Sequence, residues 1–599
     1  MKNKNFLLKN IIYTWKKVKD YKESKLYFLS LGIIFLSVII PFLTMALPSV
    51  VIWLLIKEVY FLNTLMIIMV YALLLLILNY LNTVLDSNSK ISVFTCRLKA
   101  GYDINHKILT TDFVNIDRQH KKTEIEKALI AVYQNDDIGF PALLEGSRSF
   151  IINIMLLILY VFFAAKLNFF IMILLIISPV ISMYAHSKNI KWLMDNDNGR
   201  GAINKKIRYL RTQSIDLKNG KDIRLYKIQN WFVDLYYSLV NLYVNWYQRE
   251  YRRYFFTDLL GRFMSCIQNI IVYGYLLYNV MNGMDIASFV LYLGVVSGIG
   301  GFIKVSFDKY AYMQKNNIHV QNYLNFMSSQ EFSNRDDGIK PEENTTHELR
   351  FENISFKYPD SDENLLDNLN LTIKKGEKLA IVGENGAGKT TLIKILCGLY
   401  QPDSGNIFID NINSKDINIY DYYKIFSVVF QDIFAIAYTI AQNIACTSND
   451  NIDYEKLNKY IKLAGLEEKI NSLPKKEQTD MLKEFDDDGI VFSGGEMQKL
   501  MLARALYKDS AVIILDEPTA ALDPIAESEM YEKYNTLIND KTSIFISHRL
   551  SSTRFCDRIL FMKNGKIVET GTHDELMKLG KEYAKMFEIQ AHYYQKEVC

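Results

Sequence analysis

The chain has 599 residues, more than one hydrophobic core usually serves, so at least two domains are expected. Its 69 Lys and Arg residues nearly balance its 66 Asp and Glu residues. This balance gives no support to nucleic-acid binding, which favours a concentrated basic face. The six cysteines form no CxxC pair and no cluster with histidine, so neither structural disulfides nor zinc sites are expected.

Residues 1–25 have the pattern of an amphipathic helix. Leu7, Ile11, Trp15 and Val18 recur at helical spacing with lysines between them, as in a helix that lies on a membrane surface. A signal peptide is the alternative, but the apolar run behind this segment is too long and no small-residue cleavage site stands out. We therefore predict a membrane-surface helix on the cytoplasmic side.

Residues 26–327 contain long apolar windows. A transmembrane helix needs about 20 mostly apolar residues to cross the hydrocarbon layer. The hydropathy pattern predicts a six-span transmembrane domain with crossings at 26–56, 59–85, 149–165, 167–186, 263–284 and 286–303. The windows hold almost no charge, so a cavity between them should not suit a small, highly charged solute; peptide, lipid and hydrophobic drug all stay open as substrates.

The connections between these windows differ in length and charge. Those at 86–148 and 188–262 are long and basic, whereas the other three are very short, at Lys57-Glu58, Lys166 and Asp285. Because Lys and Arg concentrate in cytoplasmic loops, the long connections belong inside, and both termini face the cytoplasm.

The two long connections show helical periodicity, which predicts helices that continue far beyond the bilayer. Residues 112–134 and 218–232 lie at the expected turns of these extensions. They are either contacts that receive motion from a cytoplasmic domain or solvated helical loops, and the sequence leaves both open.

After a polar linker at 328–347, residues 348–599 alternate β-like and helical runs, as in an α/β domain. A β-like run at 379–382 leads into a glycine-rich loop and an apolar-periodic helix, which is the context of a phosphate-binding P-loop. Backbone N–H groups of such a loop wrap phosphates, Lys389 would reach the β- and γ-phosphates, and the Thr390 hydroxyl would ligate Mg²⁺. The nucleotide-binding residues predicted here are Gly383, Glu384, Asn385, Gly386, Ala387, Gly388, Lys389, Thr390 and Thr391.

A second motif is the apolar run 512–515, which fits a buried parallel strand that delivers Asp516 and Glu517 at its end. Asp516 there can hold Mg²⁺, usually through water, and Glu517 can orient and polarise an attacking water. The alternative is a solvated acidic pair at a strand end, which the P-loop upstream in the same domain makes less attractive.

Between these motifs, residues 492–496 read FSGGE and precede a helical run. With this motif the chain resembles ATP-binding cassette (ABC) transporters of the exporter type over nearly its whole length, FSGGE standing where the family has LSGGQ. The resemblance implies further ATP-site residues: Tyr358 stacking on adenine, Gln431 linking the nucleotide and Mg²⁺ to the membrane helices, Asp523 in the D-loop, His548 at the γ-phosphate, and Ser493, Gly494 and Gly495 facing phosphates bound by a partner chain.

Glu496 stands where the family usually has Gln, and Phe492 where it has Leu. Neither position supplies a group expected to face phosphate, so activity should survive both departures. The acidic stretch LKEFDDDG, together with SGGEMQK and ALDPIAESEMYEK, resembles the subset that contains lantibiotic and other peptide exporters. Asp486-Asp487-Asp488 is either a contact with the membrane helices or a solvated acidic loop.

The resemblance implies a multidomain membrane protein. An all-α six-helix transmembrane domain with long cytoplasmic helical extensions would precede an α/β P-loop nucleotide-binding domain. ATP and Mg²⁺ are the expected cofactors, and a dimer is expected because one chain's signature completes the other's ATP site. A homodimer is favoured, with a related chain as the alternative partner.

The function implied is ATP-driven export of a peptide or hydrophobic compound across the cytoplasmic membrane. An importer or lipid flippase of the same fold, and a regulatory membrane ATPase that transports nothing, are the alternatives. No cysteine precedes Cys96 and the first span starts near Leu26, so no N-terminal cysteine peptidase domain is expected.

Overall fold

The structure is a computed structural model, and it describes residues 4–167, 169–331, 333, 337–342, 346–358, 361, 363–432, 434–517 and 541–596. The chain divides into two compact units. Unit 1 comprises Met1–Thr110 and Gln119–Ser329, and unit 2 comprises Thr111–Arg118 and Gln330–Cys599.

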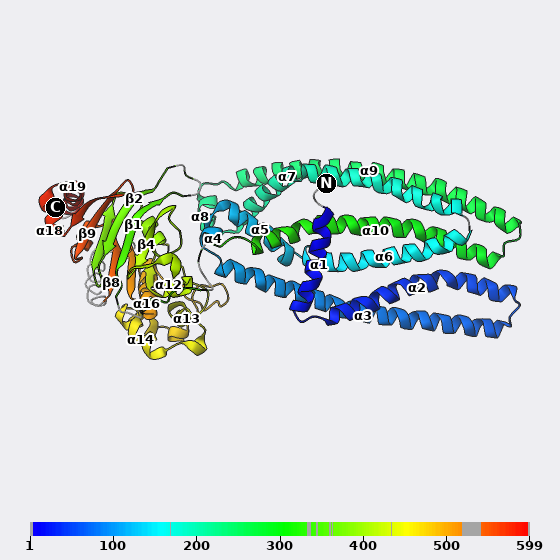
Figure 1. Cartoon of the computed structure of the whole chain (residues 1–599), viewed down its shortest axis with the longest axis horizontal. Helices are drawn as coiled ribbons and strands as arrows, with labels where there is room; N and C mark the ends of the chain where they lie inside the picture. Colours follow the sequence, from blue (N-terminus) through cyan, green and yellow to red (C-terminus); the bar gives the residue numbers. More distant parts are fainter. Residues whose placement is uncertain are drawn as a thin grey trace. The chain divides into compact units, whose positions relative to one another are not determined.

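Unit 1 is built from helices alone among its described residues (Figure 1). The pairs α2–α3, α6–α10 and α7–α9 pack along much of their lengths. The helices are α1 (Lys4–Asp20), α2 (Lys25–Ile56), α3 (Phe61–Thr110), α5 (Gln119–Tyr133), α6 (Phe140–Leu167), α7 (Phe169–Ile215), α8 (Leu217–Leu225), α9 (Gln229–Met281) and α10 (Ile286–Met327).

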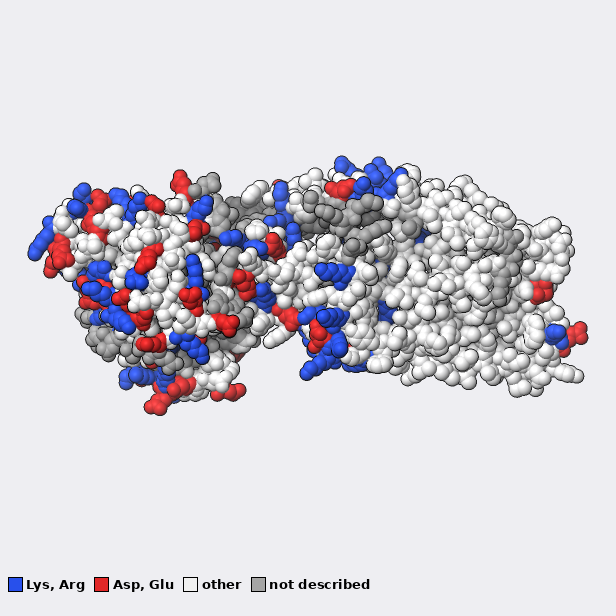
Figure 2. Space-filling view, viewed as in Figure 1, with Lys and Arg blue, Asp and Glu red and all other residues white. Residues whose placement is uncertain are grey.

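The long helices of unit 1 extend beyond one membrane thickness. Helices α3 and α9 have 50 and 53 residues, which at 1.5 Å per residue is about 75 and about 80 Å, against about 30 Å of hydrocarbon. The predicted helical extensions are therefore confirmed. On the face drawn in Figure 2, charged side chains are sparse over much of unit 1 and dense over unit 2.

Within the described part of the chain, five helical stretches are long and apolar enough to cross a membrane: Lys25–Ile56, Phe61–Thr110, Phe140–Ala165, Phe169–Leu193 and Ile286–Met327. The predicted crossing at 263–284 is not among them. It falls at the end of α9, where Gln268, Asn269 and Asn279 dilute the apolar character. A multipass helical domain is thus present, and the sixth crossing stays a prediction.

The amphipathic helix α1 forms, but its apolar side faces protein. Leu7 and Val18 are buried in two clusters of unit 1. Asn10 Nδ2 donates to Asn317 Oδ1 of α10 at 2.8 Å, and Trp15 Nε1 donates to Ser147 Oγ of α6 at 3.0 Å. The apolar spacing that predicted a membrane-surface helix is accounted for by these contacts, so the place of α1 on a membrane stays a prediction.

Unit 2 has two sheets. A six-stranded sheet runs β10-β9-β3-β8-β7-β6, parallel except for the β9–β10 pair, and an antiparallel sheet runs β2-β1-β4-β5. The strands are β1 (Leu349–Phe356), β2 (Leu366–Ile373), β3 (Lys378–Gly383), β4 (Ser404–Ile409), β5 (Ile412–Asn413), β6 (Phe426–Val429), β7 (Val512–Asp516), β8 (Thr542–Ile546), β9 (Arg558–Lys563) and β10 (Lys566–Gly571).

The helices of unit 2 include α4 (Val114–Asp117), α11 (Lys389–Leu396), α12 (Ile419–Lys424), α13 (Ile440–Ala445), α14 (Tyr454–Leu463), α15 (Glu467–Asn471), α16 (Gly494–Lys508), α18 (His573–Leu579) and α19 (Glu582–Lys596). Unit 2 begins before the predicted domain start at 348, because Ile339 already forms a bridge with Ile417.

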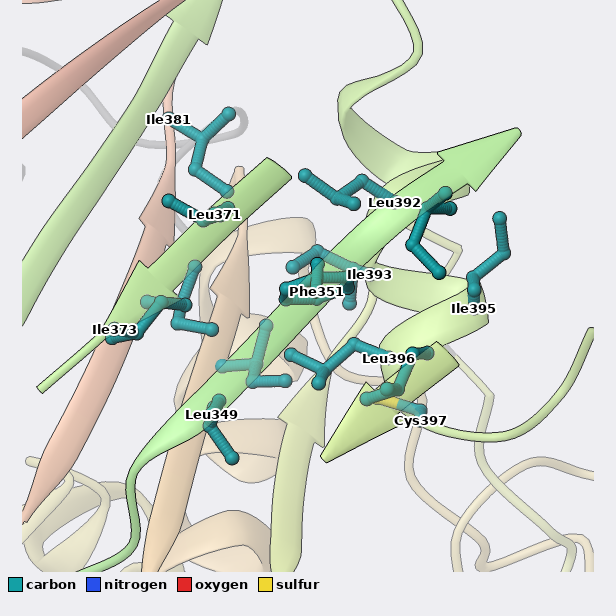
Figure 3. Packing of buried hydrophobic residues seen from close by; sticks show 14 of the residues in the cluster. Leu349, Phe351, Leu371, Ile373, Ile381, Leu392, Ile393, Ile395, Leu396 and Cys397 are labelled. Carbon is teal, nitrogen blue, oxygen red and sulfur yellow. The ribbon is translucent and has the colours of Figure 1, made fainter. Parts of the chain in front are cut away.

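The six-stranded sheet is covered on both faces. In β3, Leu379 and Ile381 enter one core cluster while Ala380 and Val382 enter the other, as the period-2 alternation of a strand requires. Figure 3 shows how α11 packs Leu392, Ile393, Ile395 and Leu396 against Leu349 and Phe351 of β1 and Leu371 and Ile373 of β2. This packing fixes the start of α11, where the P-loop ends.

The short segment Thr111–Arg118 belongs to unit 2 although the residues before and after it belong to unit 1. The Phe113 and Tyr400 rings meet edge to face with centroids 5.7 Å apart, and the Tyr400 hydroxyl donates a hydrogen bond to Asp117. Of the two interpretations of residues 112–134, contact with the nucleotide-binding domain therefore holds for their first part, while the transfer of motion stays a prediction.

Candidate nucleotide-binding site

The P-loop connects β3 to α11 in backbone conformations that favour glycine. Gly383, Gly386 and Gly388 have φ of +148°, +82° and +98°. A Cβ atom on Gly383 would lie 2.1 Å from the carbonyl oxygen of Met562 in β9, so this position excludes every side chain. The loop therefore brings bare backbone N–H groups to the start of α11.

Some side chains of the P-loop are exposed to solvent and others are buried in the core. Glu384 and Asn385 are exposed at its tip, and Glu384 pairs with Lys563 of β9 at 3.4 Å. Ala387 is buried in the core. Glu384, Asn385 and Ala387 would accordingly meet a nucleotide through their backbone, as predicted for the loop as a whole.

Lys389 is held against the loop. Its Nζ donates to the carbonyl oxygens of Gly383 and Glu384, both at 3.0 Å, and the side chain is buried. Burial lowers the pKa of Lys389, while Glu517 and Asp516 act in the opposite direction. A buried ammonium whose contacts are neutral carbonyls is suited to receive phosphate oxygens in their place.

Asp516, at the end of β7, is 1% exposed, and neither of its carboxylate oxygens has a hydrogen-bond partner among the described residues. Burial raises its pKa, and the approach of the Thr390 hydroxyl opposes that rise. A buried carboxylate without a partner is costly unless a cation meets it. Thr390 and Asp516 thus fit Mg²⁺, the remaining ligands being water and phosphate oxygens as this ion prefers.

Glu517 lies between two side chains from distant parts of the chain. His548 Nε2 is 2.5 Å from Oε1 of Glu517, and Gln431 Nε2 donates to Oε2 at 3.2 Å. Burial, assisted by the charge of Lys389, lowers the pKa of His548, so the imidazole is neutral and donates through its Nε2–H. Burial raises the pKa of Glu517. The carboxylate is therefore oriented by two donors.

Sheet topology explains this meeting. The P-loop follows β3, Gln431 follows β6, Glu517 follows β7 and His548 follows β8, and these neighbouring strands are parallel. Parallel strands end at the same edge of a sheet, where α/β proteins bind ligands. The backbone of Glu517 turns sharply there, with φ of +52°. The structure thus brings together the predicted catalytic pair, Glu517 and His548.

Tyr358 is half-buried beside the P-loop helix. Its hydroxyl is 3.0 Å from Thr391 Oγ1, and its ring meets those of Phe356 and Tyr400 edge to face, with centroids 5.2 and 5.5 Å apart. Its stacking on adenine stays a prediction. Tyr400 joins Tyr358 to Phe113, and no pattern in the sequence marks it, because its role depends on contacts far along the chain.

The signature motif forms the exposed start of α16. Ser493 caps the helix: its N–H and its hydroxyl both donate to Glu496 Oε2, at 2.8 and 3.0 Å. Lys469 pairs with Glu496 at 3.0 Å. Burial raises the pKa of Glu496, but the Ser493 N–H and Lys469 outweigh it and bring the pKa down. Glu496 thus serves the cap as Gln would, and Phe492 is buried in the core.

Two other predictions concern residues that are not part of this site, Asp523 and the acidic loop at 486–488. Asp523 lies outside the described residues. In the acidic loop, Asp486 pairs with Lys475 at 3.2 Å and accepts from the N–H of Asp488, so this carboxylate is used within unit 2.

Comparison with known proteins agrees with this site. Residues 366–520 match the family model described as ABC transporter. The chain is 28% identical over 509 residues to the subtilin transport ATP-binding protein SpaT of Bacillus subtilis, across 82% of this chain and 80% of that protein. It is 28% identical over 505 residues to the nisin transport ATP-binding protein NisT of Lactococcus lactis subsp. lactis, across 82% of each.

Two further matches differ in extent. An ATP-dependent lipid A-core flippase of Methylobacillus flagellatus is 37% identical over 242 residues, which is 40% of this chain and 41% of the flippase. The structure of a bacterial Atm1-family ABC exporter with ATP bound superposes with a TM-score of 0.75 at 18% identity, covering 98% of this chain and 99% of that one.

A P-loop, an acidic pair and a histidine at one sheet edge, in a chain that also carries several long apolar helices, define a multipass membrane protein that couples ATP hydrolysis to transport. Residues 366–520 belong to an ABC transporter ATPase domain, and the chain has the fold of an ABC exporter half.

Proposed function

We propose that the chain works as a dimer, favoured here as a homodimer, that exports an amphipathic peptide across the cytoplasmic membrane. The observation that carries the peptide proposal is a pair of adjoining cavities in unit 1 with opposite chemical character. Their residues come from helices that the sequence predicts to cross the membrane.

The first cavity lies among α7, α9 and α10 and has a volume of about 710 Å³. Each helix contributes ionisable side chains to its lining, and His186 Nε2 is 3.2 Å from Asp258 Oδ1. Ionisable groups inside a helical membrane domain are costly and usually functional. The ionisable residues that line it are His186, Asp258, Arg262, Lys304 and Asp308.

The sequence predicts that a cavity between the apolar windows does not suit a small, highly charged solute, and that stays a prediction. Four of the ionisable residues flank the apolar windows in the sequence and His186 ends one of them, so window hydropathy hardly registers them. Helix packing brings the flanks of three windows to one cavity. A substrate held there can carry both cationic and anionic groups.

The second cavity has a volume of about 790 Å³ and is lined mainly by apolar and aromatic side chains, including Met45, Tyr160 and Phe289. Tyr273 and Ser297 line both cavities, so the two adjoin. One molecule that spans them needs a charged part and an apolar part. An amphipathic peptide has both, and so does a lipid, whereas a small ion has no apolar part and a purely hydrophobic compound no charge.

The relatives support the same choice. Those named for subtilin and nisin transport match over 82% of the chain, which includes both units in part, whereas the lipid A-core flippase matches over 40%. A match confined to less than half of the chain bears little on a substrate held by unit 1. A flippase is accordingly the second candidate, because a lipid with a charged headgroup also has a charged part and an apolar part.

In the proposed ATP site, Lys389 binds the β- and γ-phosphates, and Glu517 orients the attacking water and accepts its proton. His548 and Gln431 hold the carboxylate of Glu517 in place. Mg²⁺, held by Thr390 and Asp516 when bound, supplies positive charge that offsets the charge of the phosphates.

The dimer proposal rests on the signature. Ser493 and Gly494 are exposed at the start of α16, where free N–H groups and the helix dipole suit phosphates bound by a partner chain. Closure of two ATPase domains on ATP then favours one state of the membrane domains, and hydrolysis favours the other. The long basic connections support an orientation with both termini in the cytoplasm.

The test uses the full chain, expressed alone and reconstituted in lipid vesicles with a cationic amphipathic peptide. Peptide-stimulated ATP hydrolysis and ATP-dependent accumulation in inverted vesicles are expected. Accumulation only in right-side-out vesicles would indicate an importer, lipid movement a flippase, and hydrolysis without any movement a regulatory ATPase. A folded wild-type chain that does not hydrolyse ATP would refute the homodimer.

A matched pair of variants tests the cavity. Gly301 of α10 lines the first cavity, and a Cβ atom there meets no described heavy atom within 4 Å, so Gly301→Leu adds a bulky side chain to the cavity wall. Gly199 of α7 is equally open but lies outside both cavities. Peptide transport should be lost in Gly301→Leu and kept in Gly199→Leu. Equal transport by both variants would contradict the assignment of the cavity.

A further inference from the structure

Helix α19 contacts the loop that carries His548. The side-chain amide of Gln590 makes two hydrogen bonds to that loop. Its Nε2 donates to the backbone carbonyl of His548 at 2.6 Å, and its Oε1 accepts from the backbone N–H of Leu550 at 3.0 Å. A single side chain thus holds the backbone on both sides of Arg549, between the end of β8 and the turn that follows.

The chemistry of these two contacts specifies an amide. A backbone N–H can only donate and a backbone carbonyl can only accept, so the side chain must offer one acceptor and one donor. Gln offers both. Glu would keep the contact with Leu550 but would set a carboxylate oxygen against the carbonyl of His548, and Leu would fill the space with neither contact.

The position of Gln590 is fixed by the core. Tyr583 and Ala584 of α19 are 0% and 3% exposed, and Tyr583 belongs to the same core cluster as Leu550. Gln590 follows Tyr583 by two helical turns, which places both on one face of α19. The hydroxyl of Tyr583 also lies 2.8 Å from His573 Nδ1 of α18. The amide of Gln590 is therefore presented by an anchored helix.

We propose that Gln590 is a positioning residue for ATP hydrolysis, acting through His548. Its two hydrogen bonds set the backbone from which the imidazole reaches Glu517, whose Oε1 lies 2.5 Å from His548 Nε2. The inference rests on the assignment of His548 to the ATP site. It extends that site to a helix that carries none of the ATP-site motifs.

The test is a double-mutant cycle on the full chain in lipid, with kcat for ATP as the readout. Gln590→Leu should lower kcat on the order of tenfold, because small misplacements of catalytic groups are costly. In a His548→Ala background the same substitution should change kcat by less than about twofold, because residues that act as one unit are not additive. An equal loss in both backgrounds would overturn the proposal.

A matched control separates positioning from the attachment of α19. Tyr583→Phe keeps the buried ring and removes the contacts of its hydroxyl with His573 and Thr553, so it weakens the anchor of α19 but leaves both hydrogen bonds of Gln590 in place. It should keep kcat while lowering the thermal unfolding midpoint. A loss of kcat equal to that in Gln590→Leu would overturn the proposal.

A second variant, Gln590→Glu, tests the proposal if Gln590→Leu does not fold. Gln590→Glu retains the contact with Leu550, and its loss of kcat should again vanish in the His548→Ala background. A His548→Ala chain with unchanged kcat would overturn the roles of both residues.

Discussion

Replacing Glu517 with Gln removes a negative charge and almost no volume. The Nε2–H of His548, 2.5 Å from Oε1, can donate to the amide oxygen of the new side chain. Gln431, whose Nε2 lies 3.2 Å from Oε2, is exposed, so its amide can turn until its oxygen accepts from the new N–H. Both contacts survive the change. A loss of rate would therefore report the lost base and not a displaced loop.

The expected loss is large. A positioned general base contributes about 10²- to 10⁴-fold to a rate, or about 2.7–5.4 kcal/mol at about 1.36 kcal/mol per tenfold. We expect Glu517→Gln to lower the kcat of the reconstituted chain by at least about 100-fold. Binding of ATP should stay within about threefold of wild type, because Lys389 and the P-loop are unchanged.

The assay compares steady-state hydrolysis with equilibrium ATP binding. The control is Glu455→Gln, which changes an exposed carboxylate in the first turn of α14 and should leave kcat within about twofold of wild type. A Glu517→Gln chain that keeps more than about a tenth of the wild-type rate would refute the role of Glu517 as the base.

Three further predictions concern the same domain. Gly383→Ala places a Cβ atom 2.1 Å from the Met562 carbonyl oxygen, so the thermal unfolding midpoint and ATP binding should both fall; an unchanged midpoint would contradict the steric argument. Tyr400→Phe removes the hydrogen bond to Asp117, worth about 1 kcal/mol, and should reduce peptide stimulation of hydrolysis more than basal hydrolysis; an unchanged ratio of the two rates would count against it. Burial raises the pKa of Glu517, so as the pH falls its carboxylate becomes protonated above the ordinary glutamate pKa of about 4.3. The kcat of the wild-type chain should decline in that pH range. If the residual kcat of Glu517→Gln declined in the same way, the pH dependence would belong to another group.

The ATPase domain could be predicted from local patterns. The P-loop needs glycines at fixed offsets after a strand, and the structure confirms a strand, positive φ at Gly383, Gly386 and Gly388, and a helix that begins at Lys389. The apolar run before Asp516 likewise forms a fully buried parallel strand. These features depend on neighbouring residues, so the linear order of the chain contains them.

Other predictions failed or stayed open where a local pattern has two physical explanations. The apolar stripe of α1 fits a lipid surface and a protein surface equally well, and the structure shows Leu7 and Val18 packed on protein. The apolar windows hold almost no charge, but hydropathy within a window does not report on the residues beside it. Those residues include Asp258 and Asp308, which line the first cavity.

The sequence by itself determined the class of this protein. Strand, loop and helix signals lie within a few residues of one another, and the chemistry of Lys389, Asp516 and Glu517 follows from their residue types. Only the tertiary structure decided which side chains meet. Gln431, Glu517 and His548 converge because β6, β7 and β8 are parallel and end at one edge, and Gln590 reaches His548 because the core holds α19 beside it. Contacts of this kind join residues far apart in the chain, and no local periodicity encodes them.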